Sequence, residues 1–510
     1  MLVAGGVLAA AAALPLAYLA IVTAGAGTDA VEALWRARTA SLVLRSLALT
    51  AAVTAATIAI AVPLAWLTVR TDLPGRRLWT VAAVLPLVIP SYIGAYAIIS
   101  ALGPVGLARD LLAPLGVERL PSIAGFPGAW LTLTLFTYPL VLLPVRAALR
   151  RLDPQLEEAA LGMGRSPAEV FRTIVLPHLA PAIAAGSLLV SLYVLSDFGA
   201  VSIMRFESFT TSIYTLYRAS FDRVGAASLA TLLAALMLVI LWLESRTRGS
   251  AALYRSAPGT ARSPRLVPLG RWRWPALAFC AAVSLLALAL PLAVLVYWSL
   301  RSVSGDVVWG AILTGAGHSL LASGLAALVA ALCAVPIAVL AVRFASPFSA
   351  AVERLSYTGH ALPGIVVALA LVFFGTRVVP GLYQTLAMLV FAFVVLFLPL
   401  AVGVTRASLL QVSPRVEEAA RSLGRGQLGV LRTVTGPLIS PGVLAGAALV
   451  FLTAIKELPA TLILAPIGFE TLATEIWKAT SIGFFERGAI PSLALLAISA
   501  LPLYLLTARD

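Results

Sequence analysis

The chain has 510 residues, of which 61% are hydrophobic and 11% are charged, and its mean hydropathy is +1.00. Soluble proteins average about 45–50% apolar and about 25% charged residues, so this composition excludes an ordinary soluble domain, and it also excludes a disordered chain. The net charge is +14, from 36 Lys and Arg against 22 Asp and Glu. In a soluble protein such an excess would suggest nucleic-acid binding, but here its meaning depends on where the basic residues lie.

Stretches of about 20 mostly apolar residues, long enough to cross a bilayer, occur about twelve times. In the first half they are Leu2–Thr23, Ser46–Val69, Trp79–Leu102, Ala129–Leu149, Pro181–Met204 and Ala226–Leu243. In the second half they are Pro275–Leu300, His318–Val342, Ser356–Gly375, Leu382–Val404, Ser440–Leu464 and Ala489–Leu506. Only Met1 precedes the first stretch, which favours a retained helix over a cleaved signal peptide. The predicted fold is an all-α integral membrane protein with about 12 transmembrane helices.

Basic residues accumulate in the cytoplasmic loops of membrane proteins. With both termini in the cytoplasm, the cytoplasmic loops carry roughly 23 basic residues and the external loops roughly 11. The densest patch lies between the sixth and seventh stretches, at residues 246–274. Its basic residues are Arg246, Arg248, Arg255, Arg262, Arg265, Arg271 and Arg273. We therefore predict cytoplasmic N- and C-termini, a basic cytoplasmic linker at 246–274, membrane lipid as a partner and no nucleic-acid partner.

An internal repeat relates the two halves of the chain. Glu157-Glu158-Ala159-Ala160 recurs as Glu417-Glu418-Ala419-Ala420, an offset of 260. The same offset matches Pro139 with Pro399, Arg146 with Arg406, Gly164 with Gly424, Pro177 with Pro437, Phe209 with Phe469 and Thr211 with Thr471. Upstream, an offset of 273 matches Ser46 with Ser319, Pro63 with Pro336 and Arg70 with Arg343. An even number of spans separates the two repeats, so the halves are predicted to be parallel in the membrane.

A polar loop between the fourth and fifth spans is the best-defined part of each repeat. In the first copy, Asp153 can cap a short helix that ends at Gly162 and Gly164. Ser166 and Glu169 then form a capping box for a second helix, which is predicted to stop before Pro177. In the second copy the corresponding signals are Ser413-Pro414, Gly424, Gly426 and Pro437. Each copy is therefore predicted to be a helix–turn–helix on the cytoplasmic face.

These loops resemble the EAA motif of type I ABC importer permeases, which reads Glu-Ala-Ala, three residues, Gly, nine residues, Ile-x-Leu-Pro. The first copy matches throughout, with Glu158-Ala159-Ala160, Gly164, Ile174 and Leu176-Pro177. The second copy departs at Val434 and Gly436. Two fused halves resemble the ferric iron permease group, which also includes thiamine and phosphonate relatives. Ser196-Asp197-Phe198-Gly199-Ala200 and Lys456-Glu457-Leu458-Pro459-Ala460-Thr461-Leu462 look most like the iron(III) members.

The resemblance implies a domain organisation. Residues 1–40 would hold the first transmembrane helix and an external loop, and residues 41–245 the first ABC transmembrane type-1 domain. The linker follows at 246–274. Residues 275–314 would hold the seventh transmembrane helix and an external loop, and residues 315–508 the second type-1 domain.

The resemblance also implies partners. Each loop would dock on one of two copies of a cytoplasmic ATP-binding subunit, and a periplasmic or lipid-anchored binding protein would deliver the substrate at the bacterial inner membrane. The only lysines, Lys456 and Lys478, lack a preceding P-loop, so ATP and Mg are expected in the partner and no cofactor in this chain. The expected coupling residues are Glu157, Glu158, Ala159, Ala160, Gly164, Arg165 and Pro177, with Glu417, Glu418, Ala419, Ala420, Gly424, Arg425 and Pro437.

Ionisable residues within membrane spans are costly and are functional candidates by default. Asp197 and Glu457 occupy equivalent repeat positions, and their oxygens would suit a hard cation. Lys456 and Tyr193 are candidates for the same translocation path. A structural role stays open, in which Asp197 caps a helix break beside Gly199 and Glu457 pairs with Lys456. No residue is firmly assigned as a metal ligand.

The function predicted is the permease subunit of an ABC importer for iron(III). The alternatives are the same architecture importing thiamine, phosphonate or polyamine, and, more remotely, a secondary transporter. A secondary transporter would need further carboxylates within the membrane and would not need two EAA loops. Catalysis by this chain is not expected, because no Ser/His/Asp or Cys/His arrangement is present.

Overall fold

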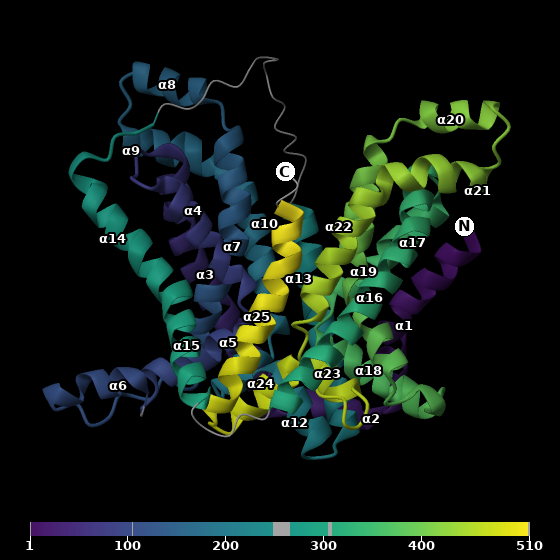
Figure 1. The fold of residues 1–510 in the computed structure, drawn as a ribbon, viewed down its shortest axis with the longest axis horizontal. Coiled ribbons are helices and arrows are strands. Elements are labelled where there is room, and N and C mark those ends of the chain that lie inside the picture. Colours follow the sequence, from purple (N-terminus) through teal and green to yellow (C-terminus); the bar gives the residue numbers. More distant parts are fainter. Residues whose placement is uncertain (1, 105, 248–265, 304–308, 508–510) are drawn as a thin grey trace. The chain divides into compact units, whose positions relative to one another are not determined.

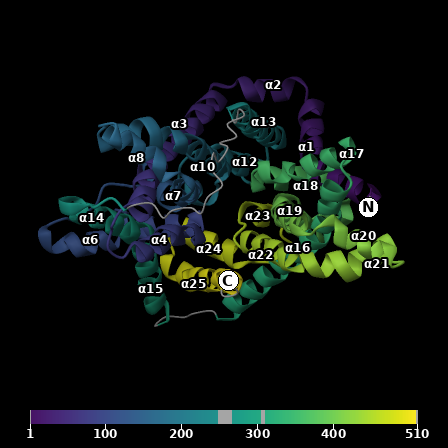
Figure 2. The ribbon, with the colours of Figure 1, turned by 90° about the horizontal axis from the view of Figure 1, so that it is seen from above.

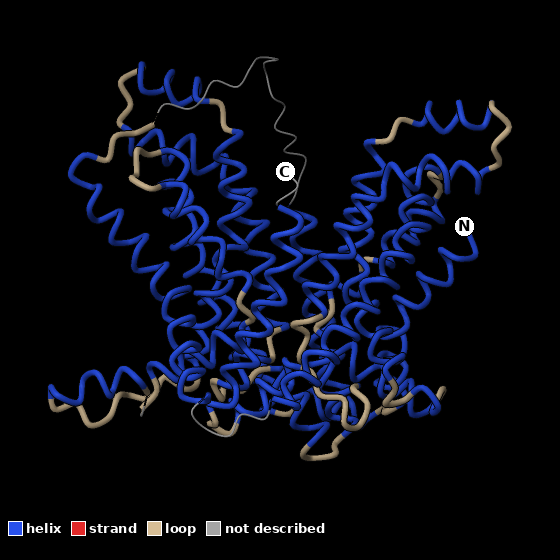
Figure 3. The backbone as a smooth tube through the Cα atoms, viewed as in Figure 1, coloured by secondary structure: helices blue, strands red, loops and turns tan. Residues whose placement is uncertain are grey.

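The structure is a computed structural model that describes residues 2–104, 106–247, 266–303 and 309–507. Over these residues the regular structure is helical, apart from one isolated bridge between Thr71 and Val267 (Figure 3). Residues 248–265, which make up most of the predicted linker, lie outside the described ranges. The chain divides into two compact units. We call them the N-terminal unit (Ala40–Thr211 and Ala235–Leu300) and the C-terminal unit (Met1–Thr39, Ser212–Ala234 and Arg301–Asp510).

Within the described residues, ten helices are long and apolar enough to cross a membrane, which confirms an all-α membrane protein. The other two predicted spans correspond to α18 (Gly364–Arg377) and α25 (Phe485–Thr507). The helix α18 has 14 residues and begins later than predicted, because Pro363 starts it and a separate helix precedes it. The third predicted span is interrupted by a 3₁₀ turn at Leu85–Val88, next to Pro90, which cannot donate a helical hydrogen bond.

The N-terminal unit is built around two long helices, α7 and α10, which pack against each other. Their close approach requires Gly186, since a Cβ there would lie 2.6 Å from Val141 Cα. The helices of this unit are α3 (Ala37–Arg70), α4 (Arg76–Val84), α5 (Ser91–Leu102), α6 (Leu107–Leu112), α7 (Phe126–Arg151), α8 (Pro154–Gly162), α9 (Pro167–Val170), α10 (Leu176–Ser196), α11 (Gly199–Ile203), α14 (Arg273–Ser284) and α15 (Leu290–Val303).

The C-terminal unit has the same plan, with α16, α19 and α22 packed together around Ala334, Leu398, Val402 and Val450. Its helices are α1 (Leu2–Gly25), α2 (Thr28–Trp35), α16 (Trp309–Arg343), α17 (Pro347–Ser356), α18, α19 (Leu386–Gln411), α20 (Pro414–Ser422), α21 (Gln427–Val430), α22 (Gly436–Ala454), α23 (Pro459–Leu464), α24 (Leu472–Ser481) and α25. Most of α12 (Phe209–Arg218) and the start of α13 (Arg223–Thr247) also belong to it.

The units do not follow the two sequence repeats, because each contains the span that precedes the other repeat. Helix α1 packs against α17 and α18 of the C-terminal unit (Figure 2), and the ring edge of Tyr18 meets Phe374 at 5.5 Å. In the N-terminal unit, Val294 of α15 packs on Ala97 and Ala101 of α5. The repeat pattern does not predict where α1 and α15 pack, because both helices precede the repeated segments.

Two short helices, α12 and α24, are anchored to the long helix that opens their repeat. The amide of Phe209 donates to Ser46 Oγ at 3.4 Å, and the amide of Leu472 donates to Ser319 Oγ at 2.9 Å. This pairs Phe209 with Leu472, an offset of 263, so the predicted matches of Phe209 with Phe469 and of Thr211 with Thr471 are three residues out of register. Within the C-terminal unit the two helices meet edge to face through Tyr214 and Trp477, 5.7 Å between ring centroids.

Candidate functional site

The first polar loop (residues 153–177, the first hairpin) forms the predicted helix–turn–helix from α8 and α9 (Figure 1). Asp153 Oδ1 accepts from the amide of Gln155 at 3.0 Å and caps α8. The turn has Gly164 at a φ of +86°, a left-handed conformation that glycine adopts without strain. Ser166 and Glu169 form the capping box of α9, in which the Ser166 amide donates to Glu169 Oε2 at 2.9 Å. The Asp153 cap, the turn at Gly164 and the capping box therefore stabilise the conformation of the first hairpin.

The second hairpin (residues 413–437) repeats this geometry with α20 and α21. Gly424 also has a φ of +86°, but Ser413 makes no side-chain capping bond. Each hairpin then runs through one π-helical turn, at Phe171–Val175 and at Leu431–Thr435, into the next long helix. The prediction that the second helix stops before Pro177 was therefore wrong, because Pro177 lies in the first turn of α10. The first arginine after each glycine contacts a threonine of its own hairpin: Arg165 donates to Thr173 Oγ1 at 3.3 Å, and Arg425 contacts Thr433.

Each EAA motif has an exposed and a buried part. Glu158, Ala159, Glu418 and Ala419 are exposed, whereas Ala160 and Ala420 are buried. Pro177 and Pro437, at the far ends of the hairpins, are also exposed. Each hairpin thus presents a carboxylate beside a small alanine side chain, a shape that another protein surface can approach closely.

The preceding glutamate of each motif points instead into its own unit. Glu157 Oε1 lies 2.9 Å from Arg70 Nη2 at the end of α3, and Glu417 Oε2 lies 3.1 Å from Arg343 Nε at the end of α16. The repeat matches Arg70 with Arg343, but this match alone does not connect either arginine to a glutamate. The arginine and the glutamate both recur in the two repeats, but their recurrence does not state that they meet.

Asp197 lies in the break between α10 and α11, and 7% of its surface is exposed. Its Oδ1 accepts from the amides of Ala200, at 2.9 Å, and Val201, at 3.2 Å. Its Oδ2 accepts from Ser91 Oγ. Both carboxylate oxygens are therefore bonded inside the N-terminal unit, which fits the structural alternative, a cap on the helix break.

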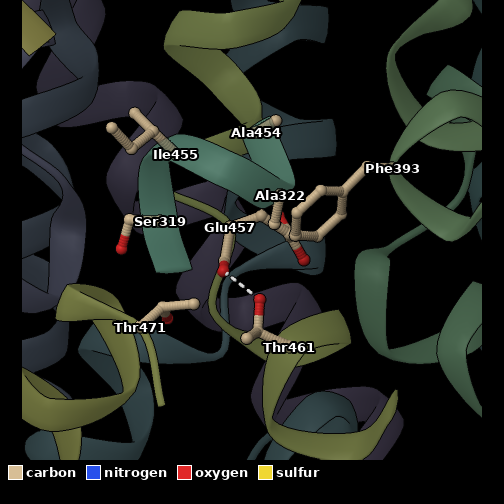
Figure 4. A pocket seen from close by; sticks show the side chains of 8 residues that line it. All are labelled: Ser319, Ala322, Phe393, Ala454, Ile455, Glu457, Thr461 and Thr471. Carbon is tan, nitrogen blue, oxygen red and sulfur yellow. Dashed lines mark hydrogen bonds between the residues drawn. The ribbon is translucent and has the colours of Figure 1, made fainter. Parts of the chain in front are cut away.

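Glu457 occupies the equivalent break between α22 and α23 but has different surroundings. Its Oε1 accepts from the amide of Ala460 at 3.2 Å, the counterpart of Ala200. It lines a small cavity of about 10 Å³, drawn in Figure 4, together with Ser319, Ala322, Phe393, Ala454, Ile455, Thr461 and Thr471. Thr461 Oγ1 donates to the main-chain oxygen of Glu457 at 2.7 Å (Figure 4).

A substitution explains why the two breaks differ. Pro90 and Pro363 each precede a helix, so Ser91 of α5 corresponds to Gly364 of α18. Glu457 Oε1 fills the place where a Cβ of residue 364 would stand. The first repeat thus combines a short carboxylate with a serine hydroxyl, and the second combines a longer carboxylate with a glycine.

The other two path candidates lie next to these breaks. Tyr193 is on α10, one turn before Asp197, with 37% of its surface exposed. Lys456 lies between α22 and α23 and is half-buried. Among the described residues, no group of three or more His, Cys, Asp or Glu is arranged to hold a metal ion.

Comparison with known proteins gives consistent matches. The family model described as "Binding-protein-dependent transport system inner membrane component" matches residues 72–248 and 334–509. The chain is 36% identical over 500 residues to the Fe(3+)-transport system permease protein FbpB 2 of Haemophilus influenzae, covering 97% of this chain and 95% of that protein. It is 28% identical over 427 residues, 76% of this chain and 72% of the relative, to the probable ABC transporter permease protein y4fN of Sinorhizobium fredii. Over 198 residues, 37% of this chain and 85% of the relative, it is 33% identical to the molybdenum transport system permease protein ModB of Escherichia coli.

Proposed function

The chain belongs to the family of binding-protein-dependent transport system inner membrane components, and from this membership we propose that it is the permease of an ATP-driven importer of iron(III). As a member of that family it is a multi-pass membrane protein and a transport subunit. Iron(III) as cargo is supported by the nearly full-length similarity to an Fe(3+)-transport permease. Both fused halves of the chain take part in that similarity.

The duplicated hairpin is the observation that carries the coupling part of this proposal. Each exposed Glu-Ala pair, Glu158-Ala159 and Glu418-Ala419, would dock on one copy of a cytoplasmic ATP-binding subunit, which would hold ATP and Mg. A positive-φ glycine fixes the turn of each hairpin, and the capping box of Ser166 and Glu169 adds to this in the first, so each hairpin would act as a rigid lever. Movement of the partner would therefore be passed to α10 and α22, which continue from the hairpins without a loop.

The orientation that we propose follows from this docking. Both hairpins have to face the cytoplasm, and roughly 23 basic residues against roughly 11 then lie in cytoplasmic loops. The N- and C-termini would also be cytoplasmic. The opposite face, which contains α12 and α24, would receive iron(III) from an external or lipid-anchored binding protein.

We assign different roles to the two intramembrane carboxylates. Glu457 would line the path of the cation, because its carboxylate borders a pocket and carboxylate oxygens suit hard ions. Asp197 would hold the break between α10 and α11 in shape, because the amides of Ala200 and Val201 and the hydroxyl of Ser91 already bind its oxygens. Tyr193 and Lys456 would border the path near these breaks.

Transport by reconstituted vesicles tests the proposal. The chain is purified with the ATP-binding subunit and the binding protein encoded next to it, and uptake of radioactive iron(III) is compared with uptake of thiamine, a phosphonate and a polyamine. We expect ATP-dependent uptake of iron(III) alone. Uptake of one of the other compounds without iron would refute the cargo, and uptake driven by an ion gradient without ATP would indicate a secondary transporter.

A further inference from the structure

The two inward-facing glutamates fasten the hairpins to the ends of long helices. Arg70 is the last residue of α3, and Arg343 is the last residue of α16. Each arginine also binds main-chain oxygens where the fourth span of its repeat ends: Arg70 reaches Leu152 O at 3.5 Å, and Arg343 reaches Val412 O at 2.8 Å. One guanidinium therefore joins three elements in each unit, namely the long helix, the end of the next span and the hairpin.

The fastening in the C-terminal unit has more bonds than its counterpart. Arg343 Nε donates to both carboxylate oxygens of Glu417 at 3.1 Å, and Thr435 Oγ1 donates to Glu417 Oε1 at 3.0 Å. Arg421 adds a longer ionic contact of 3.9 Å. All of these groups converge on one carboxylate whose side chain is 6% exposed.

The fastening in the N-terminal unit lacks these additional groups. Val175 stands at the position of Thr435, and Leu161 at the position of Arg421. The Nε of Arg70 is buried without a hydrogen-bond partner in the described residues. Burial raises the pKa of Glu157 above its ordinary value, and Arg70 only partly counters this shift. The first ion pair is therefore less well compensated for its loss of water than the second.

We propose that Arg70–Glu157 and Arg343–Glu417 are positioning pairs that fasten the two hairpins, and that the first hairpin separates from its unit more readily than the second. The buried hydroxyl of Thr435 makes this difference, because a hydrogen bond to a charged group is stronger than one between neutral groups. The inference rests on the proposed function only where it makes the hairpins the elements that couple to ATP. During each cycle the first hairpin would then move before the second.

Two nearly isosteric substitutions test the fastening in the purified chain, without any partner. Thr435→Val removes the hydroxyl from the second fastening, and Val175→Thr introduces it into the first. We expect amide hydrogen exchange of α20 to become about tenfold faster in Thr435→Val, and exchange of α8 to become several-fold slower in Val175→Thr. Thr453→Val is the matched control, because its hydroxyl bonds only to carbonyls of its own helix, Leu449 O and Val450 O.

Unchanged exchange of both hairpins in the two variants would overturn the inference, whatever the chain transports. Exchange that is equally slow in α8 and α20 of the unmodified chain would also overturn it. In the reconstituted importer, Thr435→Val should lower the amount of cargo moved per ATP hydrolysed, while Thr453→Val should not. If exchange responds as expected but iron(III) is not imported, the proposed cargo fails and the fastening stands.

Discussion

At the scale of single residues, Asp197 and Glu457 show how one repeat position acquires two environments. The carboxylate of Asp197 is fully bonded by Ser91 and two main-chain amides. In the second repeat, Gly364 replaces the serine and the carboxylate is one methylene longer. Glu457 therefore fills the space of the absent side chain and borders a pocket, rather than only capping a helix.

Gly364→Ser should destabilise the chain, because its side chain would overlap Glu457 Oε1. Overpacking of this kind costs typically about 1–3 kcal/mol. The double variant Gly364→Ser/Glu457→Asp recreates the arrangement of the first repeat and should recover most of that loss, as measured by thermal unfolding in detergent. Its iron(III) uptake should nevertheless fall well below that of the unmodified chain. Full uptake by the double variant would contradict the path role of Glu457.

Glu475 on α24 provides a pH-dependent prediction. Burial, followed by the nearby charge of Glu470, raises its pKa to about 7. The folded chain therefore holds a proton on Glu475 between about pH 4.5 and about pH 7, where the unfolded chain does not. Stability should fall as pH rises through this window. The unfolding temperature of Glu475→Gln should fall less over the same pH range. That of Glu486→Gln, a substitution at an exposed position of α25, should fall as much as in the unmodified chain. If the unfolding temperature of Glu475→Gln fell with pH as steeply as that of the unmodified chain, the raised pKa would not belong to Glu475.

At the scale of elements, the hairpins show what sequence alone can predict. Gly164, Ser166 and Glu169 act on neighbouring residues, so the turn and the capping box were predictable from their order. The pairing of Arg70 with Glu157 was not, because the two residues lie on different helices and nothing in the sequence states which helix ends meet. The interruption near Pro86 and Pro90 was also missed, since proline is tolerated within membrane helices and its presence alone does not locate a break.

Gly164 and Gly424 should tolerate asparagine but not valine. Both have positive φ, and a Cβ at either position meets no atom within 4 Å, so backbone strain rather than crowding decides the outcome. A left-handed conformation costs an L-residue roughly 1–2 kcal/mol, and asparagine adopts it more readily than valine. The Val/Val double variant should insert into the membrane but lose stimulation of the partner's ATPase. The Asn/Asn variant should keep most of it. Normal transport by the Val/Val variant would remove the hairpins from the coupling mechanism.

At the scale of the whole molecule, the exchanged helices make the two repeats mutually dependent. Helix α1 supplies Ala9, Ala12 and Leu19 to the buried core and packs against α17 and α18. The sequence could not predict this, because α1 is apolar around its whole circumference and any apolar surface in the membrane would accept it.

Cutting the chain in the linker should therefore preserve assembly, but separating the pieces should not. Fragments 1–247 and 266–510, expressed together, should co-purify and elute as one species in size-exclusion chromatography. Fragment 266–510 alone lacks α1, α2 and α12, and it should be degraded or aggregate. Limited proteolysis checks whether fragment 266–510 folds on its own. If its cleavage pattern matched that of the co-expressed pair, α1 would not be needed for folding.

The contact between Tyr214 and Trp477 joins positions that correspond in the two repeats, because the offset of α12 and α24 is 263. In a homodimer of the first half alone, Tyr214 would contact the Tyr214 of the second copy, and in a homodimer of the second half Trp477 would do the same. Residues on the twofold axis of a symmetric oligomer meet in this way. Because both halves lie in one chain, the two positions can carry different side chains. One ring is a tyrosine and the other a tryptophan, a pairing that two identical copies of one half could not provide.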